Sequence, residues 1–166
     1  MIDAEIRDRA RGIRLLVLDV DGVLTDGRIY MGAAGESMKV FHVRDGAGVV
    51  AAVRAGIAVA IISGRRSVAV ERRAAELGIS HVRQGIEDKA AALAELQREL
   101  GVTAAETACV GDDTPDLPML AGAGLAVAVA DAHPALAARA HWTTSAAGGR
   151  GAVREICDLL VSARAS

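Results

Sequence analysis

Aromatic residues are scarce in this sequence: they make up 2% of the 166 residues, with one Trp, one Tyr and one Phe. The hydrophobic fraction is nevertheless 52%, which excludes a disordered chain and leaves Ala, Val, Leu and Ile to fill the core. Only two cysteines are present, Cys109 and Cys157. Their separation fits no metal-ligand spacing, and we expect Cys109, which lies in an apolar run, to be a buried thiol, as suits a reducing cytoplasm.

Basic tracts and long apolar runs are also missing. The formal net charge of −2 argues against a nucleic-acid partner. Residues 1–14, MIDAEIRDRARGIR, are charged and lack the apolar core of a signal peptide. The longest weakly polar run, AGAGLAVAVA, is too short and too rich in Gly to cross a bilayer. These absences favour a cytoplasmic protein with a small-molecule partner and no membrane association.

Short apolar runs alternate with amphipathic stretches along the whole chain. We expect strands at 15–20, 57–64, 79–85, 106–113 and 125–130, and helices at 47–56, 67–78, 87–101, 114–124 and 133–140, with a Gly-rich loop and then a terminal helix within 148–165. Nearly all-apolar strands that alternate with helices predict a parallel sheet covered on both faces. The expected fold class is therefore α/β, a Rossmann-like three-layer α/β/α sandwich formed by a single domain over residues 1–166.

Two segments stand apart from this alternation. RIYM and MKVFHV flank GAAGE, which predicts a β-hairpin insert at about 28–43. No stretch that follows is long enough for a cap domain. The C-terminal tail, about 148–166, begins with a Gly-rich loop and ends in a helix.

Polar residues end several of the expected strands. Asp19 and Asp21 lie at the end of the first, Ser63 ends the second, and Asp112 and Asp113 end the strand at 106–113. Lys89 opens the helix after the strand at 79–85. Because ligands of parallel sheets bind beyond the carboxyl ends of the strands, we expect these side chains to meet at one edge.

This set of side chains suits phosphoryl chemistry. Carboxylates brought close repel each other unless a cation lies between them, and an all-oxygen site favours Mg²⁺ over zinc. Ser63 lies where backbone N–H groups can bind an anion, and Lys89 can contact both a phosphate and a carboxylate. A carboxylate such as Asp19 can act as a nucleophile on phosphorus. Asp21 can protonate the leaving oxygen and then activate water.

DVDGVLTDG, IISGR, Lys89 and GDDTPD resemble, in order, the four motifs of haloacid dehalogenase-like phosphatases. The resemblance implies that Asp19 is the nucleophile and Asp21 the general acid and base. It implies that Asp19, the main-chain carbonyl of Asp21 and Asp112 hold Mg²⁺, and that Ser63 and Lys89 bind the phosphoryl group. Asp113 and Asp116 are expected to support the metal site.

The short hairpin and the absence of a cap resemble the capless branch of this family. Within it, GRIYMGAAGESMKVFHVRDGAG, VAVADAHP and GGRGAVREICDLL are similar to the group that hydrolyses 3-deoxy-D-manno-octulosonate 8-phosphate in lipopolysaccharide sugar biosynthesis. That resemblance implies a homotetramer in which neighbouring subunits cover each site. It also implies that the tail reaches a neighbour's site, so we expect the segment from Gly148 onward to contribute more to substrate affinity than to stability. The substrate contacts that it implies come from a turn at 42–46 and from three further side chains: His42, Val43, Arg44, Asp45, Gly46, Arg65, Arg73 and Lys89.

Two departures leave the sugar open. Family members often have Asn at the position of His42 and Arg at that of Val50. A nine-carbon keto-acid 9-phosphate is therefore a second candidate substrate. A receiver-type signalling domain and a non-catalytic tetramerising module are two further hypotheses, and the intact motifs argue against both. His81, His133, His141 and Trp142 are expected to be structural, and Arg150 is either a loop residue or a contact to a neighbouring subunit.

Overall fold

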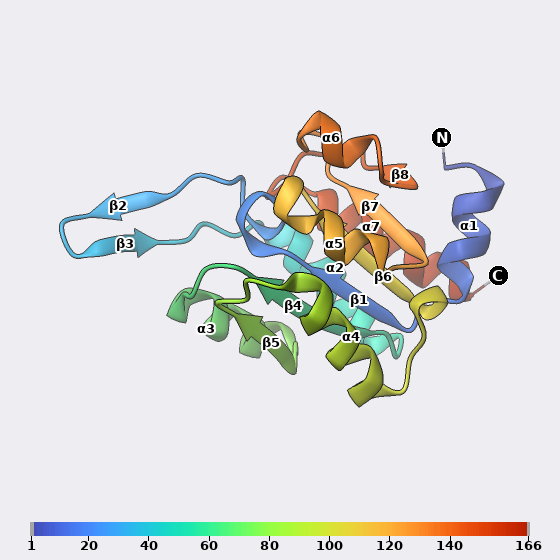
Figure 1. Ribbon diagram of the computed structural model, residues 1–166. Helices are drawn as coiled ribbons and strands as arrows, with labels where there is room; N and C mark the ends of the chain where they lie inside the picture. The colour runs from blue at the N-terminus through green and yellow to red at the C-terminus, as the bar shows by residue number, and fades with distance from the viewer. Residues whose placement is uncertain (1, 166) are drawn as a thin grey trace.

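The computed structural model describes residues 2–165 and contains seven α-helices and eight strands within that range (Figure 1). In chain order they are α1 Ala4–Arg11, β1 Leu15–Leu18, β2 Tyr30–Gly32, β3 Gly35–Met38, α2 Val43–Arg54, β4 Ala58–Ser63, α3 Val68–Leu77, β5 His81–Gln84, α4 Lys89–Leu100, β6 Thr107–Gly111, α5 Leu117–Ala121, β7 Leu125–Ala128, α6 Pro134–Ala137, β8 Trp142–Thr143 and α7 Ala152–Arg164. None of the helices in the described part has the length and hydropathy of a membrane span.

Six strands form one sheet in the order β5-β4-β1-β6-β7-β8. Every neighbouring pair in it is parallel. β1, β6 and β7 are buried along their whole length, as expected for a parallel sheet with both faces covered. The predicted α/β fold is therefore confirmed.

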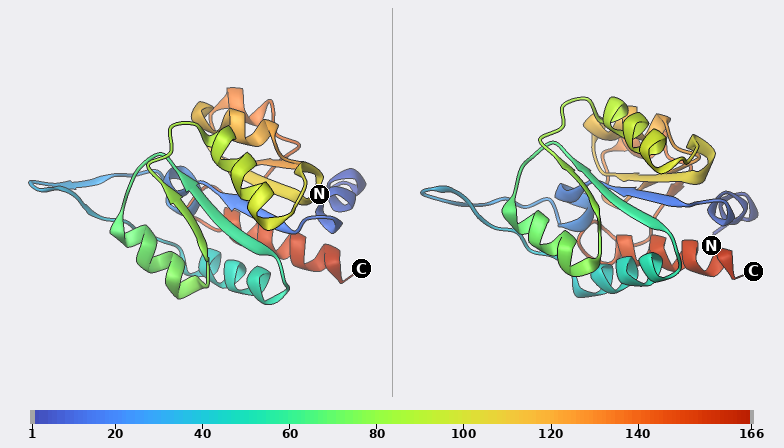
Figure 2. Two further views of the ribbon diagram at one scale, coloured as in Figure 1. Left: turned by 60° about the horizontal axis from the view of Figure 1, so that its bottom comes forward. Right: turned by 90° about the horizontal axis from the view of Figure 1, so that it is seen from below.

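Helices cover both faces of the sheet (Figure 2). The core on one face combines apolar side chains of α1, α2, α3 and α7 with one set of strand residues. The core on the other face uses α4, α5 and α6. Aliphatic side chains fill both layers, and the single Trp packs against the first. The aliphatic core expected from the few aromatic residues is thus confirmed.

The predicted hairpin is present as β2 and β3, which pair antiparallel and project away from the sandwich (Figure 1). It is shorter than predicted. Three of its apolar side chains are notably exposed: Met31 is 67% exposed, Met38 55% and Val40 51%. Burying such side chains against another protein surface would be favourable.

The C-terminal helix α7 packs against α1 and α2. Its side chains Val153, Ile156, Cys157 and Leu160 have no exposed area. Removal of this helix would open the core, so the expectation that the segment from Gly148 onward matters more for substrate affinity than for stability is wrong. In sequence, the Gly-rich stretch before α7 resembles the start of a flexible tail, but the apolar side chains of α7 form part of the core.

Three other elements differ from the prediction. Helix α1 was not predicted, because its charged residues obscure the pattern of its two buried ones. The Asp3 carboxylate stabilises its start by accepting from the Ile6 amide at 2.8 Å. The two-residue strand β8 is too short to give a pattern. Helix α2 begins at Val43 rather than 47, so the predicted turn at 42–46 is mostly helical.

Candidate active site

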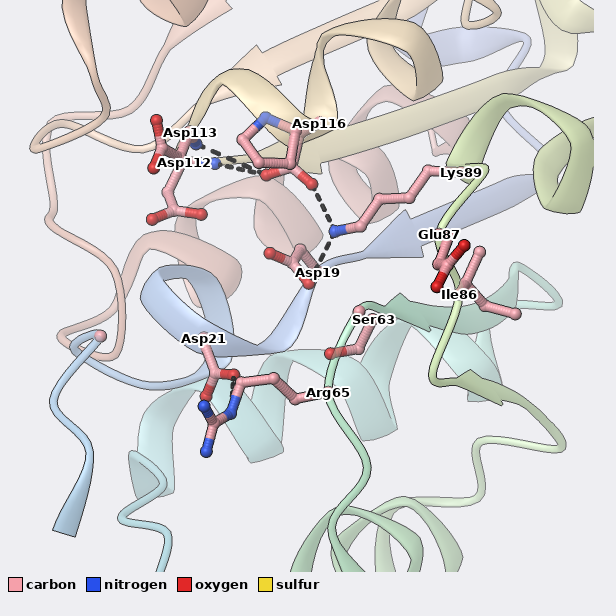
Figure 3. Close-up of a pocket in the computed structure, with 13 residues that line it drawn as sticks. Asp19, Asp21, Ser63, Arg65, Ile86, Glu87, Lys89, Asp112, Asp113 and Asp116 are labelled. Carbon is pink, nitrogen blue, oxygen red and sulfur yellow. Dashed lines mark hydrogen bonds and ion pairs between the residues drawn. The ribbon is translucent and has the colours of Figure 1, made fainter. Parts of the chain in front are cut away.

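The carboxyl ends of β1, β4 and β6 surround a cavity of about 310 Å³. Eight of the predicted site residues line it: Asp19, Asp21, Ser63, Arg65, Lys89, Asp112, Asp113 and Asp116 (Figure 3). They come from three strand ends and from the start of α4. The structure thus brings together the side chains that the strand-end pattern predicted to meet.

The turn after β1 holds the first two carboxylates. Asp19 is extended (φ −73°, ψ 170°), and the chain reverses at Gly22, whose φ is 86°. The Thr25 hydroxyl accepts from the amides of Gly22 at 3.3 Å and Gly27 at 3.2 Å. A Cβ at residue 22 would collide with the Asp112 carboxylate. Glycine is therefore required here both by the backbone conformation and by the close approach of a site residue.

Lys89 connects the ends of two strands. Its ammonium group lies 3.1 Å from the Asp19 carboxylate and 2.5 Å from that of Asp116, and all three side chains are largely buried. Burial lowers the pKa of Lys89, but the charges of Asp19 and Asp116 outweigh this effect and raise it overall. Lys89 is therefore a fixed positive charge beside Asp19.

Asp116 lies almost completely inside the protein. Besides Lys89, it accepts a hydrogen bond from the Asp112 amide at 3.1 Å. Asp113 caps the following turn by accepting from the Thr114 amide at 2.7 Å. Both side chains thus shape the loop that carries Asp112, which supports the predicted supporting role.

Asp19, Asp112 and Asp116 each offer a carboxylate oxygen, and these atoms lie within 4.8 Å of one another. Burial and the charge of Asp116 raise the pKa of Asp19 to about 7, against the opposing effect of Lys89. Burial and then Asp19, Asp116 and Asp113 raise the pKa of Asp112 to about 7. Asp19 and Asp116 are buried and Asp112 is half-buried. A carboxylate cluster of this kind, in which burial and mutual repulsion disfavour ionisation, fits a divalent cation with oxygen ligands.

Ser63 and Arg65 lie on the opposite side of the cavity from Asp112 (Figure 3). The main-chain carbonyl of Ser63 accepts from the Ile86 amide at 3.0 Å, which ties the end of β4 to the loop before α4. The Arg65 guanidinium lies 3.5 Å from Asp21 and 2.9 Å from Glu36, and it is 47% exposed. It is therefore available to an anionic ligand.

The other predicted substrate contacts do not line this cavity. His42 caps α2, accepting from the Arg44 amide at 3.2 Å through Nδ1. Val43 is exposed. Asp45 is buried and accepts from the amides of Arg154 at 2.9 Å and Gly151 at 3.3 Å. Asp45 therefore fastens the start of α7 to α2, and its side chain faces the core.

Gly46 and Arg73 line a separate groove between α2 and α3, together with Val50. The groove and the carboxylate cavity share no lining residue.

The three histidines that were expected to be structural make structural contacts. Nδ1 of His133 and of His141 accept from the Ala135 and Ala126 amides, and His81 pairs within the sheet.

Several residues of the site were not predicted from the sequence. Gly27, Gly64, Ile86, Glu87 and Pro115 also line the cavity. Lys39 and Glu36 come from the hairpin and contact Asp21 directly or through Arg65. Charged residues in a hairpin usually face solvent, so their pattern in the sequence did not indicate a contact with the site. The rarity of lysine in the chain was a signal that could have indicated a role for Lys39.

Known proteins share both the sequence and the fold. Residues 82–156 match the haloacid dehalogenase-like hydrolase family. The 3-deoxy-D-manno-octulosonate 8-phosphate phosphatase of Escherichia coli strain B is 52% identical over 163 residues, which cover 98% of this chain and 87% of that protein. The corresponding protein of Yersinia pestis is 51% identical over 160 residues, 96% of this chain and 86% of the relative.

Solved structures agree with these sequence matches. A crystal structure of the Moraxella catarrhalis 3-deoxy-D-manno-octulosonate 8-phosphate phosphatase in complex with a magnesium ion, a phosphate ion and a KDO molecule superposes with a TM-score of 0.94 at 43% identity, covering 97% of this chain and 92% of that one. The Yersinia pestis structure gives a TM-score of 0.96 at 50% identity, covering 99% and 89%. The chain belongs to the 3-deoxy-D-manno-octulosonate 8-phosphate phosphatase family of haloacid dehalogenase-like hydrolases.

Proposed function

We propose that this protein hydrolyses 3-deoxy-D-manno-octulosonate 8-phosphate to the free sugar acid and phosphate, as a step of lipopolysaccharide sugar biosynthesis in the cytoplasm. The observation that carries the proposal is the intact cavity, in which a carboxylate oxygen of Asp19 lies 3.1 Å from the Lys89 ammonium and within 4.8 Å of one of Asp112, in a chain 52% identical to an enzyme with that name. Two buried free cysteines are consistent with a reducing compartment.

The proposed reaction has two steps. In the first, a carboxylate oxygen of Asp19 attacks phosphorus, the bond from phosphorus to the sugar oxygen breaks, and Asp21 gives its proton to that oxygen. In the second, Asp21 takes a proton from water, whose oxygen attacks phosphorus and releases phosphate from Asp19. The same side chain thus serves as acid and then as base.

The remaining side chains bind the phosphoryl group and neutralise its negative charge. Lys89, 3.1 Å from Asp19, would contact a phosphoryl oxygen, as would the Ser63 hydroxyl at the end of β4. Arg65 would leave Asp21 and Glu36 to bind the anionic substrate. Each of these contacts compensates negative charge on the transferring group.

Asp19, Asp112 and the main-chain carbonyl of Asp21 would hold Mg²⁺. When bound, the ion would neutralise charge on the phosphoryl oxygens and on the carboxylate cluster. Asp116 is already occupied by Lys89 and the Asp112 amide, so it fits a supporting role better than that of a ligand.

We further propose a homotetramer assembled through the projecting hairpin. The support is the exposure of Met31, Met38 and Val40 and the separation of the groove at Gly46 and Arg73 from the chain's own carboxylate cavity. A neighbouring subunit could bring that groove, with the residues at 42–46, to the site. Sedimentation of Met31→Glu is expected to give smaller species than the unmodified protein; an unchanged mass would contradict assembly through the hairpin.

Phosphate release from a substrate panel tests the function. The panel contains 3-deoxy-D-manno-octulosonate 8-phosphate, a nine-carbon keto-acid 9-phosphate and simple hexose phosphates, each with and without Mg²⁺. Preference for the eight-carbon acid with Mg²⁺ is the expected result. Preference for the nine-carbon acid would keep the mechanism and change the substrate, and release from none of them would refute the proposal.

A further inference from the structure

Lysine is almost absent from this chain. Of 19 lysine and arginine side chains, only Lys39 and Lys89 are lysines. The ammonium groups of both lie between two carboxylates at the site, that of Lys89 between Asp19 and Asp116 and that of Lys39 between Asp21 and Glu36. An ammonium is a compact point charge, whereas a guanidinium is a planar fork. The other basic side chains of this chain are arginines. Its two lysines lie where a small cation fits between two carboxylates.

Lys39 follows β3 at the base of the hairpin, and its side chain is only 4% exposed. Its Nζ donates to Oδ1 of Asp21 at 2.6 Å and to Oε2 of Glu36 at 3.1 Å. A buried charge of this kind is retained only where it is paired and hydrogen-bonded. Both contacts join charged groups, and the contact with Asp21 has the short length of a charge-assisted hydrogen bond, which is stronger than a neutral one.

Arg65 closes the same network more loosely. It donates to Glu36 at 2.9 Å, but its Nε lies 3.5 Å from Oδ2 of Asp21 and about half of the side chain is exposed. Figure 3 shows the Asp21 carboxylate turned toward Arg65. The two oxygens of Asp21 thus differ: Oδ1 is held by a buried cation, and Oδ2 faces an exposed one that can move.

We propose that Lys39 is a positioning residue for Asp21, which it holds through Oδ1 so that Oδ2 exchanges the proton with the leaving oxygen and with water. The inference rests on the proposed function, because it assigns a positioning partner to Asp21, the general acid and base of the proposed reaction. Each carboxylate of the Asp19-x-Asp21 pair then has its own lysine. Lys39 comes from the hairpin, so this insert takes part in the chemistry of a site that no cap domain covers.

A purely structural role would have Lys39 only fasten the hairpin to the sandwich. The two roles differ in their dependence on the leaving group. Loss of an oriented acid slows the departure of an alkoxide such as a sugar oxygen, which needs a proton, far more than that of p-nitrophenolate, which does not. If Lys39 only holds the hairpin against the sandwich, its loss would lower the rate for both substrates by the same factor.

The test is kcat/KM of Lys39→Met for the sugar-acid phosphate and for p-nitrophenyl phosphate, since kcat/KM reports the steps up to loss of the leaving group. We expect a fall of about 100-fold or more for the sugar phosphate, the lower end of general acid catalysis, and of less than about 5-fold for the aryl phosphate. Equal falls, or no fall, would overturn the proposal. Failure of the unmodified protein to release phosphate would instead refute the proposed function.

Ser37→Ala is the matched control, because the Ser37 hydroxyl donates to the Tyr30 carbonyl within the hairpin at 2.9 Å and does not contact Asp21. It is expected to change kcat/KM for neither substrate. Lys39→Cys, alkylated with bromoethylamine, restores an ammonium at nearly the same distance, and Cys109 and Cys157 are buried and protected. Recovery of the sugar-phosphate activity supports the role of the charge; full alkylation without recovery contradicts it.

A measurement that leaves Lys39 in place covers the case in which the Lys39 variants do not fold. Growth on ¹³C-labelled lysine labels only Lys39 and Lys89, because no other lysine is present. In Asp21→Asn protein, we expect the Lys39 ε-methylene resonance to shift relative to the wild-type protein while that of Lys89 stays. If the Lys39 resonance does not move, the contact with Asp21 is absent and the proposal fails.

Discussion

We expect the metal-free protein to lose stability as the pH rises from about 5.5 to about 8, because buried Asp19 becomes ionised over this range. Burial and the nearby Asp116 raise its pKa from 3.8 to about 7. A carboxyl whose pKa is higher in the folded than in the unfolded state binds its proton more tightly when folded. This contribution is therefore present at low pH and is lost as the pH rises through the folded-state pKa.

The size of the effect follows from the two pKa values. With about 7 in the folded state and 3.8 in the unfolded state, proton binding by Asp19 contributes about 2 kcal/mol at pH 5.5 and nearly nothing at pH 8. Asp112, whose pKa is also raised to about 7, acts in the same direction. Burial lowers the pKa of His141, which acts in the opposite direction, so a control is needed.

Urea unfolding at both pH values, in the presence of EDTA and at one protein concentration, measures the effect. Asp19→Asn is the control, because it keeps His141 and removes the Asp19 carboxyl, together with the part of the Asp112 pKa shift that the Asp19 charge causes. Relative to wild type, the variant is expected to be more stable at pH 8 than at pH 5.5 by about 2 kcal/mol. An equal stability difference at both pH values, or a difference of opposite sign, would refute the reasoning.

Four further results are expected from the structure. Added Mg²⁺ is expected to raise the unfolding midpoint of the wild-type protein more at pH 8 than at pH 5.5, since protons compete with it for Asp19; equal shifts in a thermal scan would contradict this. Asp45→Ala is expected to cost about 2 kcal/mol by removing the acceptor at the start of α7, while kcat in a phosphate-release assay changes little; a lost kcat with unchanged stability would show a substrate contact instead. Gly22→Ala is expected to abolish phosphate release, because its Cβ would displace the Asp112 carboxylate; normal turnover would disprove the close approach. Leu160→Ala, in the fully buried stripe of α7, is expected to cost about 2–5 kcal/mol in urea unfolding; a cost near zero would place this helix outside the core.

The sequence predicted the sheet and the residues at its carboxyl edge because both rest on local patterns. Apolar runs such as 15–18 fix the strands, and parallel strands bring their ends to one edge wherever the helices lie. Asp19, Ser63 and Asp112 were therefore found without knowledge of the packing. Their meeting in one cavity is a consequence of topology.

The parts that sequence could not predict depend on packing between distant segments. Asp45 resembles a residue of an exposed turn, but its carboxylate is buried by α7, more than a hundred residues later. The Gly-rich loop at 148–149 resembles a flexible tail, yet the Gly149 amide donates to the Val23 carbonyl at 2.9 Å. Lys39 reaches Asp21 only because the hairpin folds back at its base. No local pattern records such contacts.

Covalent catalysis by Asp19 is the central claim, and trapping the intermediate tests it most directly. Enzyme with Mg²⁺ is mixed with 3-deoxy-D-manno-octulosonate 8-phosphate, quenched in acid within milliseconds, digested, and analysed by mass spectrometry. We expect one added phosphoryl group on the peptide that contains Asp19, and none in Asp19→Asn protein. Phosphate release without any phosphorylated peptide at early times, or with the group on another residue, would contradict the claim.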